Sequence, residues 1–264
     1  MLRFASLGSG SKGNATVVAA GDTVVLIDCG FSLRETRRRL ALLGLQPEQL
    51  TAILVTHEHS DHSAGVSRLA RQCNIPVYLT QGTWNSGRLE GCPEVVCFNC
   101  EHRFQIGHLE VEAVAVPHDA REPCQFRLHH AGRSVGVLTD LGSVTSHVVE
   151  RFRGCDALVL EFNHDLEMLH SGSYPAALKR RVAGDWGHLN NQQAAALLQQ
   201  LGMEKLQHLV VAHISENNNC LQRAASALAA VYGPLDERVV FAAQDRGFDW
   251  LRLAAVAGQG QPLQ

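Results

Sequence analysis

The chain has 264 residues, of which 45% are hydrophobic and 19% are charged, so it contains enough apolar side chains for a sizeable core. Its formal net charge of −3 excludes a globally basic surface that would attract nucleic acid everywhere. No run approaches the roughly 18 apolar residues that span a bilayer, and the first residues lack the apolar stretch of a secretory signal. We therefore expect no membrane partner, a cytoplasmic location and one domain over residues 1–264.

The first third of the chain predicts short strands followed by a helix. Apolar or β-branched runs alternate there with glycine-rich turns, which is typical of strands. The expected strands cover residues 3–7, 15–20 and 23–28. Ser32 and Glu35 have the spacing of a capping box, so a helix should continue to about Leu43 and stop at Gly44.

The remainder of the chain predicts further strands, joined by helices in the last third. Val66, Leu69, Ala70 and Cys73 recur at helical spacing, and Asn190 is a candidate helix cap. Further strands are expected at residues 52–55, 109–116, 124–128, 134–138, 157–161 and 206–212, and a further helix at 221–231. Because the strands fall into two groups that are each associated with helices, the pattern predicts an α/β fold of two packed sheets with helices outside.

Eight scattered cysteines and two basic runs are weaker signals. Reduced thiols are expected in a chain of this length. Cys97 and Cys100 have the spacing of half a zinc site or a redox pair, but no second pair completes it, so we interpret this spacing as chance. The runs 37–39 and 179–181 are interpreted as solvated helix faces.

The hexapeptide His57-Glu-His-Ser-Asp-His62 stands directly after a predicted strand. Residues two apart in an extended turn project to one side, so His57 and His59 can hold one ion while Asp61 and His62 face a neighbouring ion. Imidazole and carboxylate ligands suit zinc, manganese or iron. A polar surface loop is the alternative, but four metal-capable side chains within six residues favour a metal site.

Three more metal-capable residues follow apolar runs elsewhere in the chain. They are His118, Asp140 and His213, and each should lie at the rim of a sheet. A single histidine after a strand is more often a structural, hydrogen-bonded residue. Three such positions beside the first cluster favour a binuclear metal centre.

Together with Asp28, these residues resemble the metallo-β-lactamase superfamily over nearly the whole chain. The resemblance implies an αββα four-layer sandwich. Five further segments resemble the YycJ (WalJ) branch, which is regarded as DNA exonuclease-like and stands beside the phosphodiesterases and the tRNA 3′-end-processing enzymes. These segments are residues 7–14, 117–120, 161–165, 187–191 and 212–218.

The resemblance also implies two ions that share one carboxylate. The implied ligands are His57, His59 and His118 for the first ion, Asp61, His62 and His213 for the second, and Asp140 between them. Asp28 would orient a ligating histidine by accepting its distal N–H. Asp61 would also orient the attacking hydroxide. The resemblance implies that His188 is the acid that protonates the leaving group. On the sequence alone, His188 is a histidine near the start of a helix, and a structural role is the alternative.

The charge of such a centre indicates the class of substrate. Two divalent ions, two carboxylates and a bridging hydroxide leave a net charge of about +1, which suits an anionic phosphodiester. Bound metals lower the pKa of water to about 7, so a metal-bridging hydroxide would be the nucleophile. We therefore predict a dinuclear hydrolase, a phosphodiesterase or exonuclease-like nuclease acting on DNA or a smaller phosphodiester. The alternatives are a thioester or lactone hydrolase and a non-catalytic metal-bearing regulatory domain.

Two segments near these residues have open roles. The loop 8–14 offers backbone N–H groups, hydroxyls and Lys12, which would suit a phosphate cradle, but a tight turn between strands explains it equally well. Asn163 and His164 follow the predicted strand 157–161 and are expected to face the same cleft.

Overall fold

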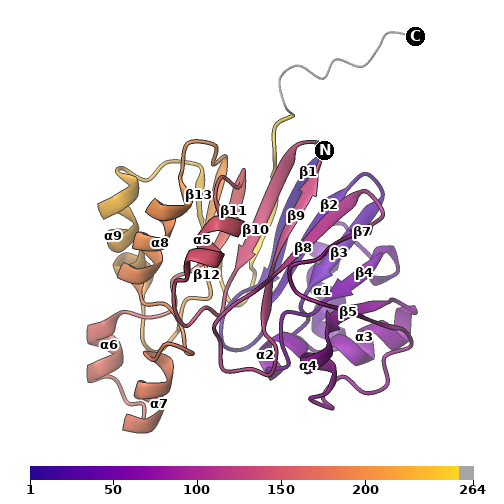
Figure 1. The fold of residues 1–264 in the computed structure, drawn as a ribbon, viewed down its shortest axis with the longest axis horizontal. Coiled ribbons are helices and arrows are strands. Elements are labelled where there is room, and N and C mark those ends of the chain that lie inside the picture. Colours follow the sequence, from indigo (N-terminus) through magenta and orange to yellow (C-terminus); the bar gives the residue numbers. More distant parts are fainter. Residues whose placement is uncertain (256–264) are drawn as a thin grey trace.

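Two seven-stranded sheets form the middle of the molecule, with helices on their outer faces, in a computed structural model that describes residues 1–255 (Figure 1). The last nine residues of the span 1–264, which was predicted to be one domain, lie outside the described residues. Among residues 1–255, no helix has both the length and the apolar character that crossing a membrane requires.

The first sheet combines an antiparallel and a parallel half. Its strands, in spatial order, are β14 (Phe248–Arg252), β1 (Leu2–Gly8), β2 (Ala15–Ala20), β3 (Thr23–Ile27), β4 (Ala52–Leu54), β5 (Val77–Thr80) and β6 (Val95–Phe98). Pairing is antiparallel from β14 to β3 and parallel from β3 to β6. The carboxyl ends of β3 and β4 therefore meet at one rim of the sheet.

The second sheet is built in the same way. Its strands, in spatial order, are β13 (Val239–Phe241), β12 (His208–Ala212), β11 (Ala157–Glu161), β10 (Arg133–Leu138), β9 (Cys124–His130), β8 (Leu109–Ala115) and β7 (Arg103–Ile106). Strands β10 to β13 are parallel, whereas β7 to β10 are antiparallel. The carboxyl ends of β10, β11 and β12 consequently share a rim as well.

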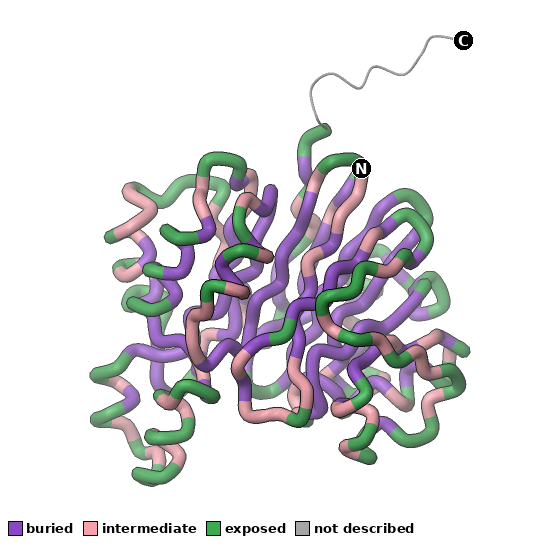
Figure 2. The backbone as a smooth tube through the Cα atoms, in the orientation of Figure 1, coloured by how far each residue is buried: buried purple, intermediate pink, exposed green. Residues whose placement is uncertain are grey.

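The helices complete the outer layers and the lower rim in Figure 1. Outside the first sheet lie α1 (Leu33–Leu42), α3 (Val66–Cys73), α4 (Gln81–Trp84) and the short 3₁₀ turn Pro47–Gln49. Outside the second lie α5 (Ser146–Phe152), α8 (Asn191–Leu201) and α9 (Leu221–Tyr232). At the rim lie α2 (Ser60–Ser63), α6 (Leu166–Ser171) and α7 (Ala176–Val182). Helix α7 has no buried residue and projects from the body (Figure 2).

Three apolar cores separate the four layers. The central core joins the inner faces of both sheets, for example Phe4 and Leu54 against Phe126. The two outer cores pack each sheet against its helices. Because both faces of each sheet are covered, strands such as β3 are buried at every position, which explains their continuous apolar runs (Figure 2). The predicted αββα sandwich is confirmed.

Local differences from the sequence predictions have clear causes. Ser32 caps α1 by accepting the N–H of Glu35, but the Glu35 carboxylate binds Arg38 and Arg39 and does not return to close a capping box. A reciprocal capping box forms instead at Asn190. Strands β13 and β14 were not predicted, because their short sequences gain their strand character from pairing with β12 and β1.

Candidate metal centre

The segment from His57 to His62 leaves β4 and ends in the single-turn helix α2. His57 and His59 precede the helix, whereas Asp61 and His62 lie within it. The interpretation of the hexapeptide as one extended turn is therefore wrong for its second half. The coiling that begins at Ser60 lets four side chains close in sequence approach two different positions.

Strained backbone marks three of the other strand ends. Asp28 follows β3, Asp140 lies two residues after β10, and His213 follows β12. Their φ angles are 61°, 53° and 50°, in the left-handed region. For a residue with a Cβ atom this conformation costs about 1–2 kcal/mol, and it persists where the surroundings fix it. Three of the six non-glycine residues with positive φ among the described residues thus lie at the rim where the two sheets meet.

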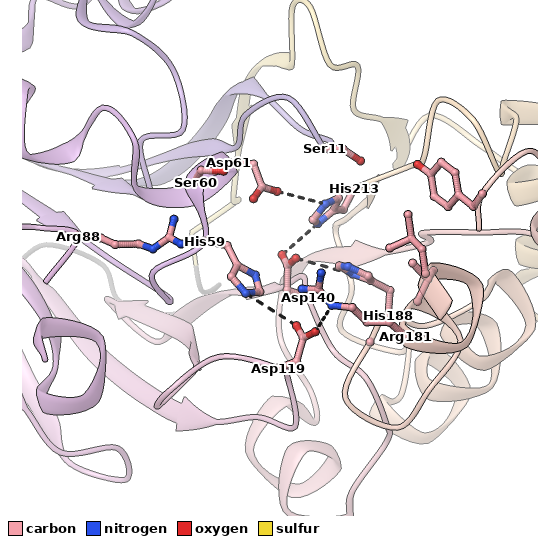
Figure 3. Close-up of a pocket in the computed structure, with 14 residues that line it drawn as sticks. Ser11, His59, Ser60, Asp61, Arg88, Asp119, Asp140, Arg181, His188 and His213 are labelled. Atoms are coloured by element: carbon pink, nitrogen blue, oxygen red, sulfur yellow. Dashed lines mark hydrogen bonds and ion pairs between the residues drawn. The ribbon is translucent and has the colours of Figure 1, made fainter. Parts of the chain in front are cut away.

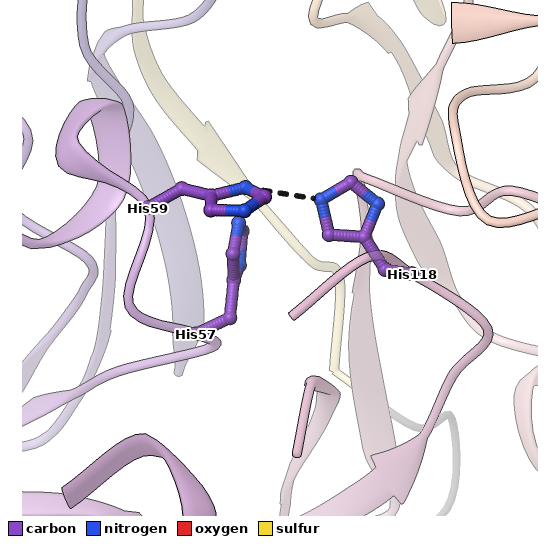
Figure 4. A group of neighbouring side chains, drawn as sticks. All are labelled: His57, His59 and His118. Atoms are coloured by element: carbon purple, nitrogen blue, oxygen red, sulfur yellow. Dashed lines mark hydrogen bonds between the residues drawn. The ribbon is translucent and has the colours of Figure 1, made fainter. Parts of the chain in front are cut away.

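His57, His59 and His118 form the first group of potential ligands (Figure 4). One nitrogen from each lies within 4.8 Å of the others, and Nδ1 of His59 is 3.3 Å from Nε2 of His118. His57 is fully buried, and its Nε2 has no hydrogen-bond partner among the described residues. Burial holds the pKa of His57 well below its ordinary value, so its imidazole is neutral and a lone pair is available. These features fit a metal ligand.

The second group consists of Asp61, His62 and His213, again with ligand atoms within 4.8 Å. Asp140 lies between the two groups. Its Oδ2 is 3.2 Å from Nε2 of His62 and 3.0 Å from Nδ1 of His213, and it also clusters with His57 and His62. The structure therefore brings together all seven residues predicted as ligands, with Asp140 in the position of a shared carboxylate.

The electrostatics of this centre favour a cation. Burial alone would lower the pKa of His62, but the surrounding carboxylates, foremost Asp140 and Asp28, raise it well above its ordinary value. Positive charge is thus retained on His62 to balance buried negative charge. Since a ligating imidazole must be neutral, a cation bound here would replace that proton. The histidine and aspartate clusters are accordingly able to bind metal ions.

Buried hydrogen bonds orient the potential ligands. Nδ1 of His62 donates to Asp28 over 2.8 Å, and the Asp28 carboxylate also accepts the N–H and the hydroxyl of Thr56 at 2.8 Å each. This contact leaves Nε2 of His62 facing the centre, as expected for Asp28. Nδ1 of His118 donates to the carbonyl of Gly187 at 3.0 Å. Each contact fixes which ring nitrogen faces the cluster.

Glu161 was not predicted as a site residue, yet it organises one side of the centre. This side chain at the end of β11 is fully buried. Its oxygens accept the N–H groups of Asp140 at 3.0 Å, Leu141 at 3.2 Å and Leu189 at 2.9 Å. It also accepts Nδ1–H of His188 at 2.9 Å. The available sequence signal was a carboxylate that ends a buried strand, where an unpaired charge would be costly.

His188 lies beside the cluster with its side chain 21% exposed. Burial opposes its protonation, but the Glu161 carboxylate outweighs this effect and raises the pKa of His188 to about 9. The imidazole therefore carries a proton at neutral pH. Because Nδ1 is held by Glu161, the remaining nitrogen is free to face the cleft, which His188 lines.

The loop 8–14 braces the centre through internal hydrogen bonds. Most of its N–H groups donate inside the protein; those of Ser9, Gly10, Lys12, Gly13 and Asn14 do so. The Asn14 amide lies 3.1 Å from Nε2 of His62 and 3.4 Å from Oδ2 of Asp61. The hydroxyl of Ser9 accepts the N–H of His213. These contacts support the turn interpretation.

Asn163 and His164 lie beneath the site. Asn163 donates to the carbonyl of His213 over 3.2 Å, and so supports the turn after β12. His164 is fully buried, and neither of its ring nitrogens has a hydrogen-bond partner within residues 1–255. Neither residue lines the cleft. The expectation that both face the cleft is therefore wrong.

An open cleft of about 500 Å³ gives access to the centre (Figure 3). His59, Asp61, Asp140, His188 and His213 line its floor. Two arginines stand at its walls: Figure 3 shows Arg88 on the side of His59, and Arg181 on the side of His188.

Arg181 corrects the interpretation of the run 179–181 as a purely solvated face. It projects from α7 to the cleft and pairs with Asp119, whose carboxylate lies 3.9 Å from Nε2 of His59. In the run 37–39, Arg39 is only 10% exposed and donates to the carbonyl of Leu7. Cys97 and Cys100 join no cluster of potential ligands among the described residues, in agreement with a chance spacing.

A four-layer αββα sandwich with five histidines and two aspartates at the shared rim of its sheets defines a class of metal-binding hydrolases. The protein-family description "Beta-lactamase superfamily domain" matches residues 23–214. The chain is 35% identical over 235 residues to Exodeoxyribonuclease YycJ of Bacillus anthracis, covering 87% of this chain and 89% of that protein. It is 34% identical over 229 residues to Exodeoxyribonuclease WalJ of Streptococcus pneumoniae, covering 84% and 85%.

The chain therefore belongs to the metallo-β-lactamase superfamily and, within it, to the YycJ/WalJ branch. Among solved structures, the metallo-β-lactamase fold protein YhfI from Bacillus subtilis superposes with a TM-score of 0.73 at 17% identity, covering 96% of this chain and all of that one. That similarity confirms the fold. The relatives confirm the predicted class of a metal-dependent, nuclease-like hydrolase.

Proposed function

We propose that this protein is a dinuclear metal-dependent phosphodiesterase that degrades DNA from an end. The observation that carries the proposal is the convergence of seven potential ligands on two adjacent positions, with Asp140 between them and the protonated His188 at the cleft wall. The relatives YycJ and WalJ are named exodeoxyribonucleases, which supports DNA as the substrate and cleavage from an end.

The residues fit two divalent ions, which we propose to be zinc or manganese, with iron as a further candidate. His57, His59 and His118 would hold one ion, and Asp61, His62 and His213 the other, with Asp140 shared. Mixed imidazole and carboxylate donors suit these metals. When bound, the ions would lower the pKa of a coordinated water to about 7 and attract the phosphate oxygens.

The protein's own groups then divide the remaining work. Asp61 lies at the cleft floor, where its carboxylate can orient the attacking hydroxide. His188 carries a proton that the departing sugar oxygen needs, and general acid catalysis of this kind contributes about 10²–10⁴-fold. Glu161 keeps that imidazole charged and aimed, so it acts as a positioning residue through His188. Arg88 and Arg181 supply positive charge at the cleft walls.

The test compares substrates on fully metal-loaded protein. Metal content is measured first, and we expect about two ions per chain. Next, 5′-labelled DNA, 3′-labelled DNA and a chromogenic phosphodiester are incubated with zinc, manganese or iron. We expect stepwise shortening of DNA from one end, and its loss in Asp61→Ala.

A control variant separates chemistry from folding. Glu112→Gln changes a buried glutamate that binds Arg103 and does not line the cleft, and it should retain activity. Fully loaded protein that cleaves no nucleic acid would refute the proposal. Rapid turnover of a thioester or lactone without phosphodiester cleavage would assign the alternative hydrolase chemistry.

A further inference from the structure

A second groove of about 440 Å³ adjoins the catalytic cleft. Arg88 lines both the groove and the cleft, so the two are joined at that side chain. Arg68 and Arg71 of α3 line the groove farther along. We infer that this groove binds the phosphate backbone of the nucleic-acid strand as it extends away from the metal centre. The inference rests on the proposed nuclease function and adds the path of the substrate.

The arginines of the groove have no acidic partner among the described residues, whereas about half of the other arginines do. Arg68, Arg71 and Arg88 are exposed, and within residues 1–255 none of them forms an ion pair with a carboxylate. Elsewhere, exposed arginines such as Arg38 and Arg238 are held by neighbouring carboxylates at 2.7 Å. The positive charge of the three groove arginines is therefore available to a ligand.

The groove is a local exception in an acidic protein. Three arginines and one acidic residue, Glu90, line it, whereas the whole chain has a net charge of −3. Guanidinium groups bind phosphate through charge-assisted, often bidentate hydrogen bonds. A polyanion would therefore be drawn to this side of the cleft and not to the surface as a whole.

The opposite side of the cleft does not offer an equivalent path. Tyr174, Leu178 and Val182 form a wall there that includes part of α7. Arg181 on that wall is already paired with Asp119. Figure 3 shows Arg88 on the far side of the centre from Arg181 and His188. A strand with its end near His188 would thus continue over Arg88 into the groove.

The experiment removes two charges from the groove and two from elsewhere. The groove variant is Arg68→Gln with Arg71→Gln. The matched control is Arg153→Gln with Arg252→Gln, which removes two exposed arginines that lack ion pairs in the described part of the chain and line neither cavity. Unchanged melting temperatures establish that both variants fold.

Binding is measured by fluorescence anisotropy with oligo(dT) of 4 to 16 nucleotides on metal-loaded protein. All proteins carry His188→Gln, which suppresses turnover but keeps every proposed ligand. The loss of two guanidinium–phosphate contacts should raise Kd for the 16-mer about tenfold, which corresponds to about 1.4 kcal/mol. The two substitutions should also reduce the slope of log binding constant against log salt concentration by about 1.4, because each phosphate contact contributes about 0.7. The control should match the parent.

Activity without His188→Gln distinguishes the two hypotheses. The groove variant should hydrolyse a chromogenic phosphodiester as well as wild type, because that substrate is too short to leave the cleft, while KM for the 16-mer rises. Equal binding of the 16-mer by the groove variant and the control would overturn the inference. If the groove variant binds the 16-mer more weakly than the control but the wild-type protein cleaves no nucleic acid, the groove is a polyanion site and the proposed function is refuted.

Discussion

Replacing Glu161 by Gln is the sharpest single test of how the centre is organised. The substitution keeps the shape of a fully buried side chain but removes its charge and turns one oxygen into an NH₂ group. Each oxygen now accepts two donors: Oε2 serves Asp140 and His188, and Oε1 serves Leu141 and Leu189. Whichever way the amide is placed, two N–H donors face another donor.

The magnitude follows from those contacts. A hydrogen bond to a charged group is worth about 1.5–3 kcal/mol, so losing two should lower the free energy of unfolding by about 3–6 kcal/mol. Catalysis should also suffer, because the carboxylate that raises the pKa of His188 to about 9 is gone. The pKa of His188 then falls towards its ordinary value of 6.5. His188 consequently loses its proton at a lower pH than in the wild-type protein, so the decline of kcat on the alkaline side begins at a lower pH.

The assay measures kcat for oligonucleotide cleavage from pH 6 to pH 10, with urea unfolding alongside. We expect Glu161→Gln to reduce kcat about 30-fold at pH 8, because a fall in the pKa of His188 from about 9 to 6.5 lowers its protonated fraction by about that factor. Glu112→Gln is the matched control, since Glu112 is equally buried and accepts from Arg103 and His129 outside the cleft lining. It should lose stability but keep the wild-type pH profile. An unshifted profile in Glu161→Gln would refute the role assigned to Glu161.

Three further perturbations probe the centre and its supports. Chelation should abolish hydrolysis and lower Tm, and zinc or manganese should restore both; an unchanged Tm would contradict a metal site coupled to folding. Gly30→Ala places a Cβ 1.9 Å from the carbonyl oxygen of Asp61, so it should cost about 1–3 kcal/mol and reduce metal content. Gly44→Ala is the control: its Cβ meets no atom, and although its φ of +72° also makes the substitution costly, the protein should keep its metal. Burial lowers the pKa of His164 to about 4, so neutral His164 is favoured in the folded state, and stability present above pH 6.5 is lost as pH falls towards 4. Up to about 3 kcal/mol of that loss, measured by urea unfolding, should disappear in His164→Asn.

The convergence of the proposed ligands could be predicted because its signals are local. His57, His59, Asp61 and His62 fall within six residues, and His118, Asp140 and His213 each follow an apolar strand. In a fold with parallel strands the carboxyl ends share a rim, so residues at strand ends converge even when they are far apart in sequence. The fold could be predicted for the same reason, because its alternating strands and helices are local features of the sequence.

The supports of the centre could not be predicted, because they depend on which loops come together in the folded chain. Glu161 gains its role only when the loops that contain Asp140 and His188, 21 and 27 residues away, close over it. Asn14 reaches His62 across 48 residues. Nothing in the local sequence of either residue distinguishes a brace from an ordinary buried polar group.

The division of the cleft follows from how these supports are distributed. Glu161 fixes His188 and the turn at Asp140 from the second sheet, so the proposed proton donor is held in place and lies on the α7 side. Arg88, by contrast, is exposed and unpaired in the described part of the chain, on the side of His59. A rigid acid suits the one bond that breaks, whereas flexible arginines suit a backbone that must advance after each cleavage. Removing the rigid group should therefore lower kcat, while removing the groove charges should raise KM.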